Sequence, residues 1–276
     1  MSDLLKRTLT GIVFLVVMVA GIIFHPLAFG ALFLIVMYFA MSEFMHVTMG
    51  ERWGFQQKMA VFTAALTFIA IVWFLFFGLN LRWIALALIP FFAIPVSVVF
   101  SKNHDTVEDV ALVYLAMVYV GLPFCLAPFI VSRDGEFNGW LLLNIFIIIW
   151  CSDVGAYSLG TLFGQKPTSR KLAPAISPKK SYWGLWGGII TAMIGAWVLY
   201  LLGLMPYPLI HCLAIGLLIP VAGVLGDLFE SVWKRRFGFK DSGKMIPGHG
   251  GMLDRFDSSL FAIPAVFVYL MLFGLL

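Results

Sequence analysis

The chain has 276 residues, of which 62% are hydrophobic and only 12% carry a charge. A soluble domain has about 25% charged residues, so this chain lacks the side chains that would cover a water-exposed surface. Its hydrophobic runs repeatedly reach the roughly 20 residues that an α-helix needs to cross a bilayer. These properties exclude a soluble globular protein and indicate an all-α integral membrane protein.

The hydrophobic runs predict a polytopic bundle of about nine transmembrane helices. They lie at 8–25, 27–46, 59–79, 82–100, 109–131, 139–162, 184–203, 207–229 and 258–275. The first run follows Lys6 and Arg7, as the apolar part of a signal peptide would. However, it is long and ends at Phe24-His25-Pro26 without a small-x-small cleavage site. We therefore expect it to be retained as the first helix.

Basic residues are distributed unevenly between the predicted loops. With the N-terminus in the cytoplasm, 16 of the 18 Lys and Arg residues fall in segments on the cytoplasmic side, and only Arg82 and Arg133 fall outside. An excess of positive charge in cytoplasmic loops is the general rule for membrane proteins. The sequence therefore predicts a cytoplasmic N-terminus and, after nine spans, an external C-terminus.

Two cytoplasmic loops, 163–183 and 231–257, are long, basic and rich in Gly, Pro, Ser and Lys. Long loops in compact proteins are usually functional or disordered. We divide the chain into N-terminal transmembrane helices, 1–135, and a C-terminal catalytic region, 136–276, which contains both loops. The expected fold has a polar cavity that faces the cytoplasm.

Carboxylates and basic residues alternate around the second loop. Asp227 and Glu230 are three residues apart and so share one helix face, and Asp254 and Asp257 repeat this spacing. Acids at the edge of the hydrocarbon layer are costly and normally mark function. Carboxylate oxygens suit Mg²⁺, and Lys and Arg suit phosphate oxygens. This combination is typical of a site for phosphoryl or nucleotidyl transfer.

The segment from Ser231 to Asp257 resembles, with its spacing intact, the signature of the phosphatidate cytidylyltransferase (CDP-diacylglycerol synthase) family. That signature reads S-x-apolar-K-R, four residues, K-D, a small residue, then P-x-H-G-G and D-R-x-D. An upstream segment, 152–181, is also similar to the family. One departure matters: the family usually has Glu where this chain has Trp183 before Gly184. No carboxylate role is carried over to that position.

The resemblance implies transfer of the cytidylyl group from CTP to phosphatidic acid, which forms CDP-diacylglycerol and pyrophosphate in phospholipid biosynthesis. The implied cofactor is Mg²⁺, and a second cation is left open. The implied partners are CTP, phosphatidic acid and membrane lipids, without nucleic acid, and a homodimer is compatible with the family. The expected location is the bacterial inner (plasma) membrane, with a cytoplasmic active site.

The same resemblance, together with the charge pattern, assigns roles to individual residues. Asp227 and Asp254 are the leading predicted metal ligands, Asp257 is a weaker one, and Asp153 is a further metal-site or orienting acid. The predicted catalytic set is Asp227, Asp254, Lys240 and Asp153. The predicted substrate contacts are Ser177, Lys179, Lys180, Lys234, Arg235, His249 and Arg255.

Each role has a structural alternative. The acids could form structural ion pairs, the basic residues could anchor the chain to anionic headgroups, and His249 could serve only as a turn residue. Glu43 could line a lipid-accessible cavity, but we prefer the interpretation that it reaches toward the membrane interface. Gly187, Gly188 and Gly195 are predicted to permit close helix packing rather than to bind phosphate.

Two other functions fit parts of the pattern. An enzyme of the same chemistry could use an ether-linked or prenyl lipid phosphate, or could transfer phosphate from CTP to a polyprenol. A secondary transporter would place its acids near the midplane on broken helices, whereas here the acids and bases cluster beside the cytoplasmic loops. A requirement for CTP and a divalent metal distinguishes the enzyme from the transporter.

Overall fold

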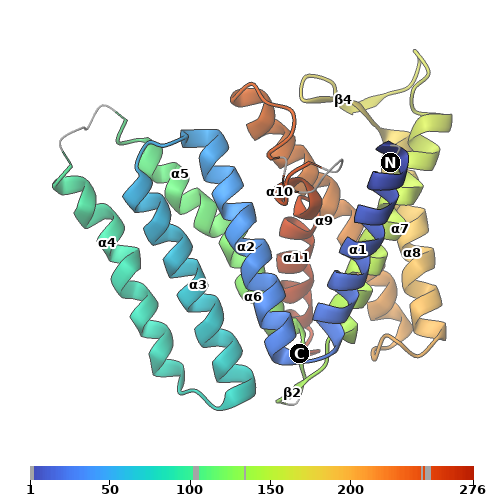
Figure 1. The fold of residues 1–276 in the computed structure, drawn as a ribbon. Helices are drawn as coiled ribbons and strands as arrows, with labels where there is room; N and C mark the ends of the chain where they lie inside the picture. Colours follow the sequence, from blue (N-terminus) through green and yellow to red (C-terminus); the bar gives the residue numbers. More distant parts are fainter. Residues whose placement is uncertain (1–2, 102–105, 134, 244, 246–249) are drawn as a thin grey trace. The chain divides into compact units, whose positions relative to one another are not determined.

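The computed structural model describes residues 3–101, 106–133, 135–243, 245 and 250–276. Helices form most of this described chain, and two short antiparallel hairpins join some of them (Figure 1). Packing divides the chain into a first unit, Met1–Phe137 with Phe239–Phe256, and a second unit, Asn138–Gly238 with Asp257–Leu276. The described residues between 239 and 256, which belong to the loop at 231–257, thus pack with the first unit.

The first unit is a bundle whose helices begin and end at recognisable signals. Helix α2 begins at Pro26, whose fixed φ and missing N–H suit the first helical position. His25 precedes it, and its Nδ1 accepts a hydrogen bond from Leu27 N at 3.1 Å. The helix ends at Gly50, where a φ of 61° favours glycine.

The elements of the first unit are α1 (Asp3–Ile23), α2 (Pro26–Met49), α3 (Gly54–Phe77), η1 (Leu81–Ala87), α4 (Leu88–Val99), α5 (Asp109–Ala116), η2 (Met117–Gly121), α6 (Leu122–Ile130), β1 (Ser132–Arg133), β2 (Glu136–Phe137) and α10 (Leu253–Phe256).

Aromatic side chains form the core of this unit. Phe29 and Phe33 lie one turn apart on α2, with ring centroids 4.5 Å apart. Phe29 also contacts Phe68 of α3, and Phe33 contacts Phe124 of α6 edge-on. All four side chains are fully buried. Tilted and edge-to-face arrangements are the favoured geometries of aromatic pairs, so these contacts hold α2, α3 and α6 together.

The second unit contains α7 (Trp140–Leu162), α8 (Tyr182–Leu201), α9 (Leu209–Arg236) and α11 (Ser259–Leu272), with a hairpin of β3 (Lys171–Ala173) and β4 (Ser177–Ser181). Helices α7 and α8 approach closely because glycines face each other. A Cβ added at Gly187 would lie 2.5 Å from Gly155 O, and one added at Gly188 would lie 2.8 Å from Ser152 Oγ. One at Gly195 would lie 3.2 Å from Cys151 Sγ. The prediction that these glycines permit close packing is confirmed.

Eight helices in the described part of the chain are long and apolar enough to cross a membrane. They match eight of the predicted runs, and the first run is the shorter apolar helix Thr8–Ile23. The fourth span, Arg82–Val99, combines η1 with α4. The prediction of an all-α, multi-pass membrane protein is therefore confirmed.

Candidate active site

A cavity of about 320 Å³ lies within the second unit, between α7, α8, α9 and strand β4. Ligand pockets usually measure about 300–1,000 Å³. The polar part of its lining consists of Ser152, Asp153, Tyr157, Lys179, Lys180, Ser181, Asp227 and Ser258. The four charged residues in this set are all predicted site residues. Two acids and two lysines from three separate segments of the chain thus surround one cavity.

Helical spacing explains how α7 and α9 contribute their acids. On α7, Asp153, Tyr157 and Gly160 recur at intervals of four and three residues and line the cavity together. On α9, Gly223 and Asp227 are four residues apart and do the same. Residues three and four apart lie on one face of a helix. Each acid therefore stands on a cavity-facing stripe whose other members are mostly small or apolar.

The two cavity lysines stand on β4, in a loop where no strand was predicted. Strand β4 pairs antiparallel with β3, with Lys171 opposite Ser181. Gln165 Nε2 donates a hydrogen bond to Lys179 O at 2.9 Å, and Arg235 Nε donates to Ile176 O at 3.1 Å. These bonds tie the hairpin to the end of α7 and to the last turn of α9, so the backbone that carries the lysines is fixed.

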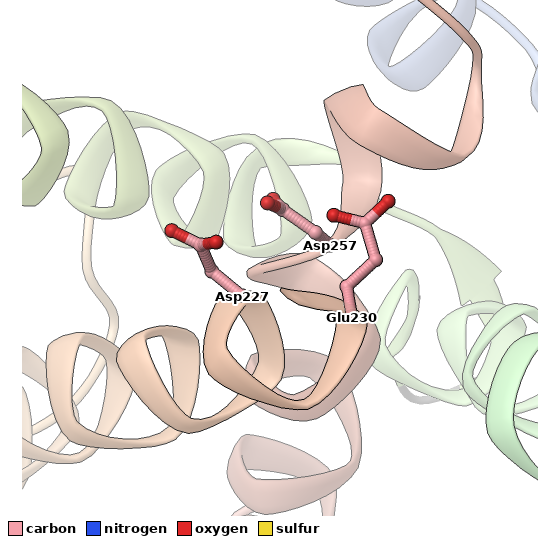
Figure 2. A group of neighbouring side chains, drawn as sticks. All are labelled: Asp227, Glu230 and Asp257. Atoms are coloured by element: carbon pink, nitrogen blue, oxygen red, sulfur yellow. The ribbon is translucent and has the colours of Figure 1, made fainter. Parts of the chain in front are cut away.

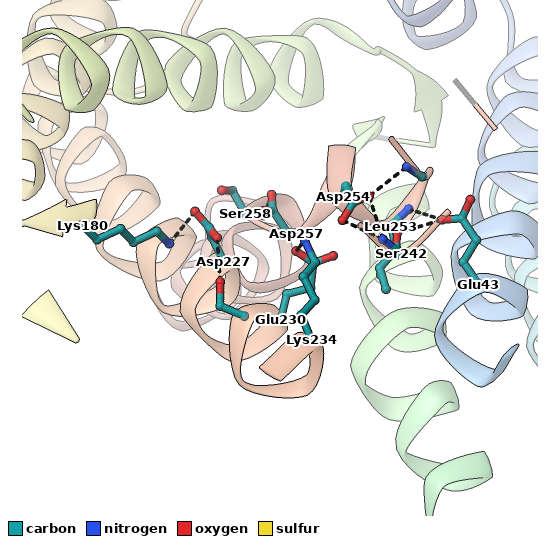
Figure 3. Close-up of polar contacts among 12 residues, drawn as sticks. Glu43, Lys180, Asp227, Glu230, Lys234, Ser242, Leu253, Asp254, Asp257 and Ser258 are labelled. Carbon is teal, nitrogen blue, oxygen red and sulfur yellow. Dashed lines mark hydrogen bonds and ion pairs between the residues drawn. The ribbon is translucent and has the colours of Figure 1, made fainter. Parts of the chain in front are cut away.

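Three carboxylates gather near the C-terminal end of α9, which we predict to face the cytoplasm (Figure 2). One oxygen from each of Asp227, Glu230 and Asp257 lies within 4.8 Å of the others. Asp227 pairs with Lys180, and Glu230 Oε2 pairs with Lys234 Nζ at 2.7 Å (Figure 3). Glu230 is almost fully buried. Asp257 lies in the break between α10 and α11, and its Oδ1 accepts a hydrogen bond from Ser258 N.

This cluster has the donors that a hard divalent cation requires. Three like charges in so small a space repel one another, and two lysines compensate only part of that charge. Oxygen donors from one or two carboxylates, completed by phosphate oxygens, are the usual ligands of Mg²⁺. The acidic cluster therefore fits a bound metal ion, and it shares Asp227 with the cavity.

Asp254, the other leading predicted ligand, belongs to the first unit. Its carboxylate accepts hydrogen bonds from Ser242 N at 3.0 Å and Gly251 N at 2.8 Å (Figure 3). These bonds organise the chain on either side of it. A carboxylate offers about four lone-pair sites, so this structural role is compatible with metal binding. The metal role of Asp254 stays a prediction.

The remaining predicted contacts are distributed over both units. In the second unit, Ser177 is half-buried at the start of β4, while Lys234 and Arg235 lie in the last turn of α9. This helix continues beyond the hydrophobic run that predicted it, and basic residues at its end are favoured by the helix dipole. Lys240 and Arg255 are exposed in the first unit. His249 lies outside the described residues.

Three polar residues of interest were not among the predicted site residues. Glu230 completes the acidic cluster, and its three-residue spacing from Asp227 was the available signal. Tyr157 lines the cavity one turn after Asp153. Glu43 of α2 accepts hydrogen bonds from Ser242 Oγ and Leu253 N, and does not simply reach toward the interface. Its partners are distant in sequence, so no local pattern identifies this contact.

The ion pair between Lys180 and Asp227 makes a testable prediction. We expect Lys180→Met to reduce kcat/KM by about 10- to 100-fold, because a hydrogen bond to a charged group contributes about 1.5–3 kcal/mol. Turnover at several substrate concentrations measures the loss. The matched control is Lys58→Met, which removes an exposed lysine from α3 and should leave the rate within about twofold. Equal rates for the two variants would contradict a role for Lys180.

Comparison with known proteins places these features in a family. The profile of the cytidylyltransferase family matches residues 5–273, which is nearly the whole chain. A protein of Bacillus subtilis (strain 168) called phosphatidate cytidylyltransferase is 43% identical over 179 residues, covering 64% of each chain.

Proteins with the same name occur among other similar sequences. One from Staphylococcus saprophyticus is 38% identical, and one from Staphylococcus aureus (strain COL) is 37% identical, each over 172 residues. These matches cover 62% of this chain and 63% of each relative. The chain thus aligns with a little under two thirds of the length of these curated relatives.

Proposed function

Because this chain belongs to the cytidylyltransferase family, we propose that it transfers the cytidylyl group of CTP to phosphatidic acid. The products would be CDP-diacylglycerol and pyrophosphate. The similar proteins named phosphatidate cytidylyltransferase support this choice of lipid. The observation that carries the proposal is the cavity in which Asp153, Lys179, Lys180 and Asp227 meet, beside a cluster of three carboxylates.

The charges of this site suit the reaction. A phosphate oxygen of phosphatidic acid forms a bond to the α-phosphorus of CTP, and the bond from that phosphorus to the oxygen bridging to the β-phosphorus breaks. Pyrophosphate leaves with the electron pair. The attacking phosphate is already anionic, so little general-base help is needed. The main task of the protein is to bring two polyanions together and hold them in line.

The residues divide this task by charge. Lys179 and Lys180 would contact phosphate oxygens and reduce the repulsion between the two substrates. Asp227, Glu230 and Asp257 would hold Mg²⁺, whereas a metal role for Asp254 is proposed from the sequence pattern alone. When bound, this ion would neutralise the triphosphate and the charge that develops on pyrophosphate. Asp153, on the α7 stripe of the cavity, would orient the lysines or contribute to the metal site.

The membrane arrangement supports a cytoplasmic site. The nine predicted runs, eight of which are matched by candidate spans, and the uneven distribution of basic residues favour a cytoplasmic N-terminus. The hairpin and the charged end of α9 would then face the compartment that contains CTP. Bacterial relatives favour the inner (plasma) membrane. A lipid that reaches the cavity from the bilayer would keep its acyl chains in the membrane.

Pyrophosphate release by the purified protein in detergent tests this function directly. We expect release only when CTP, phosphatidic acid and Mg²⁺ are all present, and we expect EDTA to abolish it and excess Mg²⁺ to restore it. Asp254→Asn should lower the rate if that carboxylate contributes to the site.

Two outcomes would change the proposal. Release with a prenyl or ether-linked lipid phosphate, but none with phosphatidic acid, would keep the chemistry and change the substrate. No nucleotide turnover with any lipid phosphate, in protein that elutes as a single folded species, would contradict an enzymatic function.

A further inference from the structure

A single carboxylate on α2 holds together a segment that is distant from it in sequence. Glu43 Oε2 accepts a hydrogen bond from Leu253 N at 2.9 Å and another from Ser242 Oγ at 3.2 Å (Figure 3). We call residues 239–243 and 250–256, which all belong to the first unit with α2, the anchored segment. One donor lies in each of the two parts of the segment, so Glu43 holds both parts rather than capping a single turn.

The backbone of the anchored segment is shaped around this carboxylate. A Cβ added at Gly243 would lie 2.5 Å from Glu43 Oε1, and one added at Gly251 would lie 2.5 Å from Glu43 Oε2. Real Cβ atoms do not approach other atoms this closely, so a side chain at either position would displace the carboxylate. This close fit is independent of the hydrogen bonds and indicates the same contact.

Ser242 links Glu43 to a second carboxylate. Its side chain donates to Glu43, and its backbone N–H donates to Asp254, which also accepts from Gly251 N. Two acids therefore hold one short stretch of chain from two sides. Hydrogen bonds to charged groups are stronger than hydrogen bonds between neutral groups. Loss of Glu43 should loosen the surroundings of Asp254 as well as its own contacts.

The anchored segment carries three of the predicted site residues, so its backbone conformation bears on the site. Lys240, Asp254 and Arg255 all stand on it, and each is a predicted contact for the metal or for phosphate. Lys240 and Arg255 are exposed, so their positions depend on the backbone beneath them. An acid in a membrane-spanning helix is costly and normally serves function. Glu43 itself contacts the segment, through Ser242 and Leu253.

We propose that Glu43 is a positioning residue of the transfer reaction, which fixes the anchored segment so that Lys240, Asp254 and Arg255 act in one arrangement. This inference rests on the function proposed above. It assigns a role in catalysis to α2, a helix of the N-terminal half that contributes no residue to the cavity described above. A site displaced by about 1 Å can lose about 100-fold in rate, so loosening the segment should lower turnover measurably.

The test combines hydrogen exchange with kinetics, and only the second depends on the substrate. In Glu43→Ala, we expect the amides of Ser242, Gly251 and Leu253 to exchange at least about tenfold faster, because their acceptors or neighbours are lost. Amides of α7 to α9 should not change. Turnover should fall about tenfold through kcat, with the KM for CTP changed less than threefold. Glu43→Gln, which keeps an acceptor oxygen of the same reach, should recover most of the rate.

Further variants separate positioning from general stability. Gly243→Ala keeps the charge but displaces the carboxylate, so it should reproduce part of both effects. Glu51→Ala removes an exposed glutamate just after α2 and should change neither. In an Asp254→Asn background, adding Glu43→Ala should cost less than about twofold, because both changes act through the same segment.

Clear results would overturn the inference. Unchanged exchange in Glu43→Ala would remove its basis, and so would kinetic losses that multiply in the double variant. Faster exchange throughout the chain would assign Glu43 to overall stability instead. If the wild-type protein releases no pyrophosphate with any lipid phosphate, the proposed function fails. The exchange results alone then decide whether Glu43 anchors the segment.

Discussion

Asp227→Asn should reduce pyrophosphate release by about 10³-fold while the protein remains folded. Asp227 is the residue that the cavity and the acidic cluster share, and it pairs with Lys180, whose Nζ is buried. Asparagine has the same shape but no charge. The variant therefore loses a donor for the cation and leaves a buried ammonium without its partner. Removing one preorganised electrostatic group from an active site typically costs about 10²- to 10³-fold in rate, and the loss of the cation's donor places Asp227→Asn at the upper end of that range.

Companion variants identify which property of Asp227 matters. Asp227→Glu keeps the charge but shifts the oxygens, so it should retain more activity than Asp227→Asn and should need more Mg²⁺ for half-maximal rate. Glu51→Gln neutralises an exposed acid and should leave the rate within about twofold. Normal turnover by Asp227→Asn would show that the acidic cluster is structural.

Periodicity and charge were sufficient to predict the bundle. The spans follow from hydrophobic runs of bilayer length, because a lipid-exposed backbone must satisfy its own hydrogen bonds as a helix. Local rules also explain why each acid faces the cavity: Asp153 shares a helix face with Tyr157, and Asp227 shares one with Gly223, by spacing alone. The end of α9 was harder to place, since its last turn is polar and lies beyond the hydrophobic run.

Contacts between segments distant in sequence could not be predicted in this way. The hairpin that carries Lys179 and Lys180 is held by Gln165 and Arg235, and neither bond has a sequence signal. Glu43 meets residues about 200 positions away. A lone acid near the end of a span resembles one that reaches toward the interface. Only the packing of the first unit distinguishes the two roles.

The cavity also depends on the close approach of α7 and α8. The sequence suggests this contact through its glycines but does not give the distance between the helices. We expect Gly187→Leu to destabilise the protein by about 3 kcal/mol, equivalent to a fall in melting temperature of roughly 6–12 °C. At Gly187 even a Cβ would lie 2.5 Å from Gly155 O and 2.8 Å from Leu159 Cβ. Gly155 O belongs to the backbone and cannot turn away, so the two helices must separate.

Separation of these helices should also reduce activity, since both line the cavity. Helix α7 contributes Asp153, and α8 contributes Gly184 and Leu185 to its wall. Thr191 Oγ1 of α8 also donates a hydrogen bond to Cys151 O of α7 at 2.8 Å, and a wider spacing would break it. Small residues at helix contacts stabilise membrane bundles by permitting this close approach.

A graded series of variants tests this explanation by thermal unfolding in detergent and by pyrophosphate release. Gly187→Ala should lose less stability than Gly187→Leu, because one methyl group requires a smaller displacement. Gly30→Ala is the matched control: its Cβ would lie 3.6 Å from Val72 Cγ1, an ordinary contact, and alanine favours the helix. A melting temperature for Gly187→Leu within about 2 °C of wild type, with full activity, would show that α7 and α8 can separate without cost. The cavity would then not depend on their close packing.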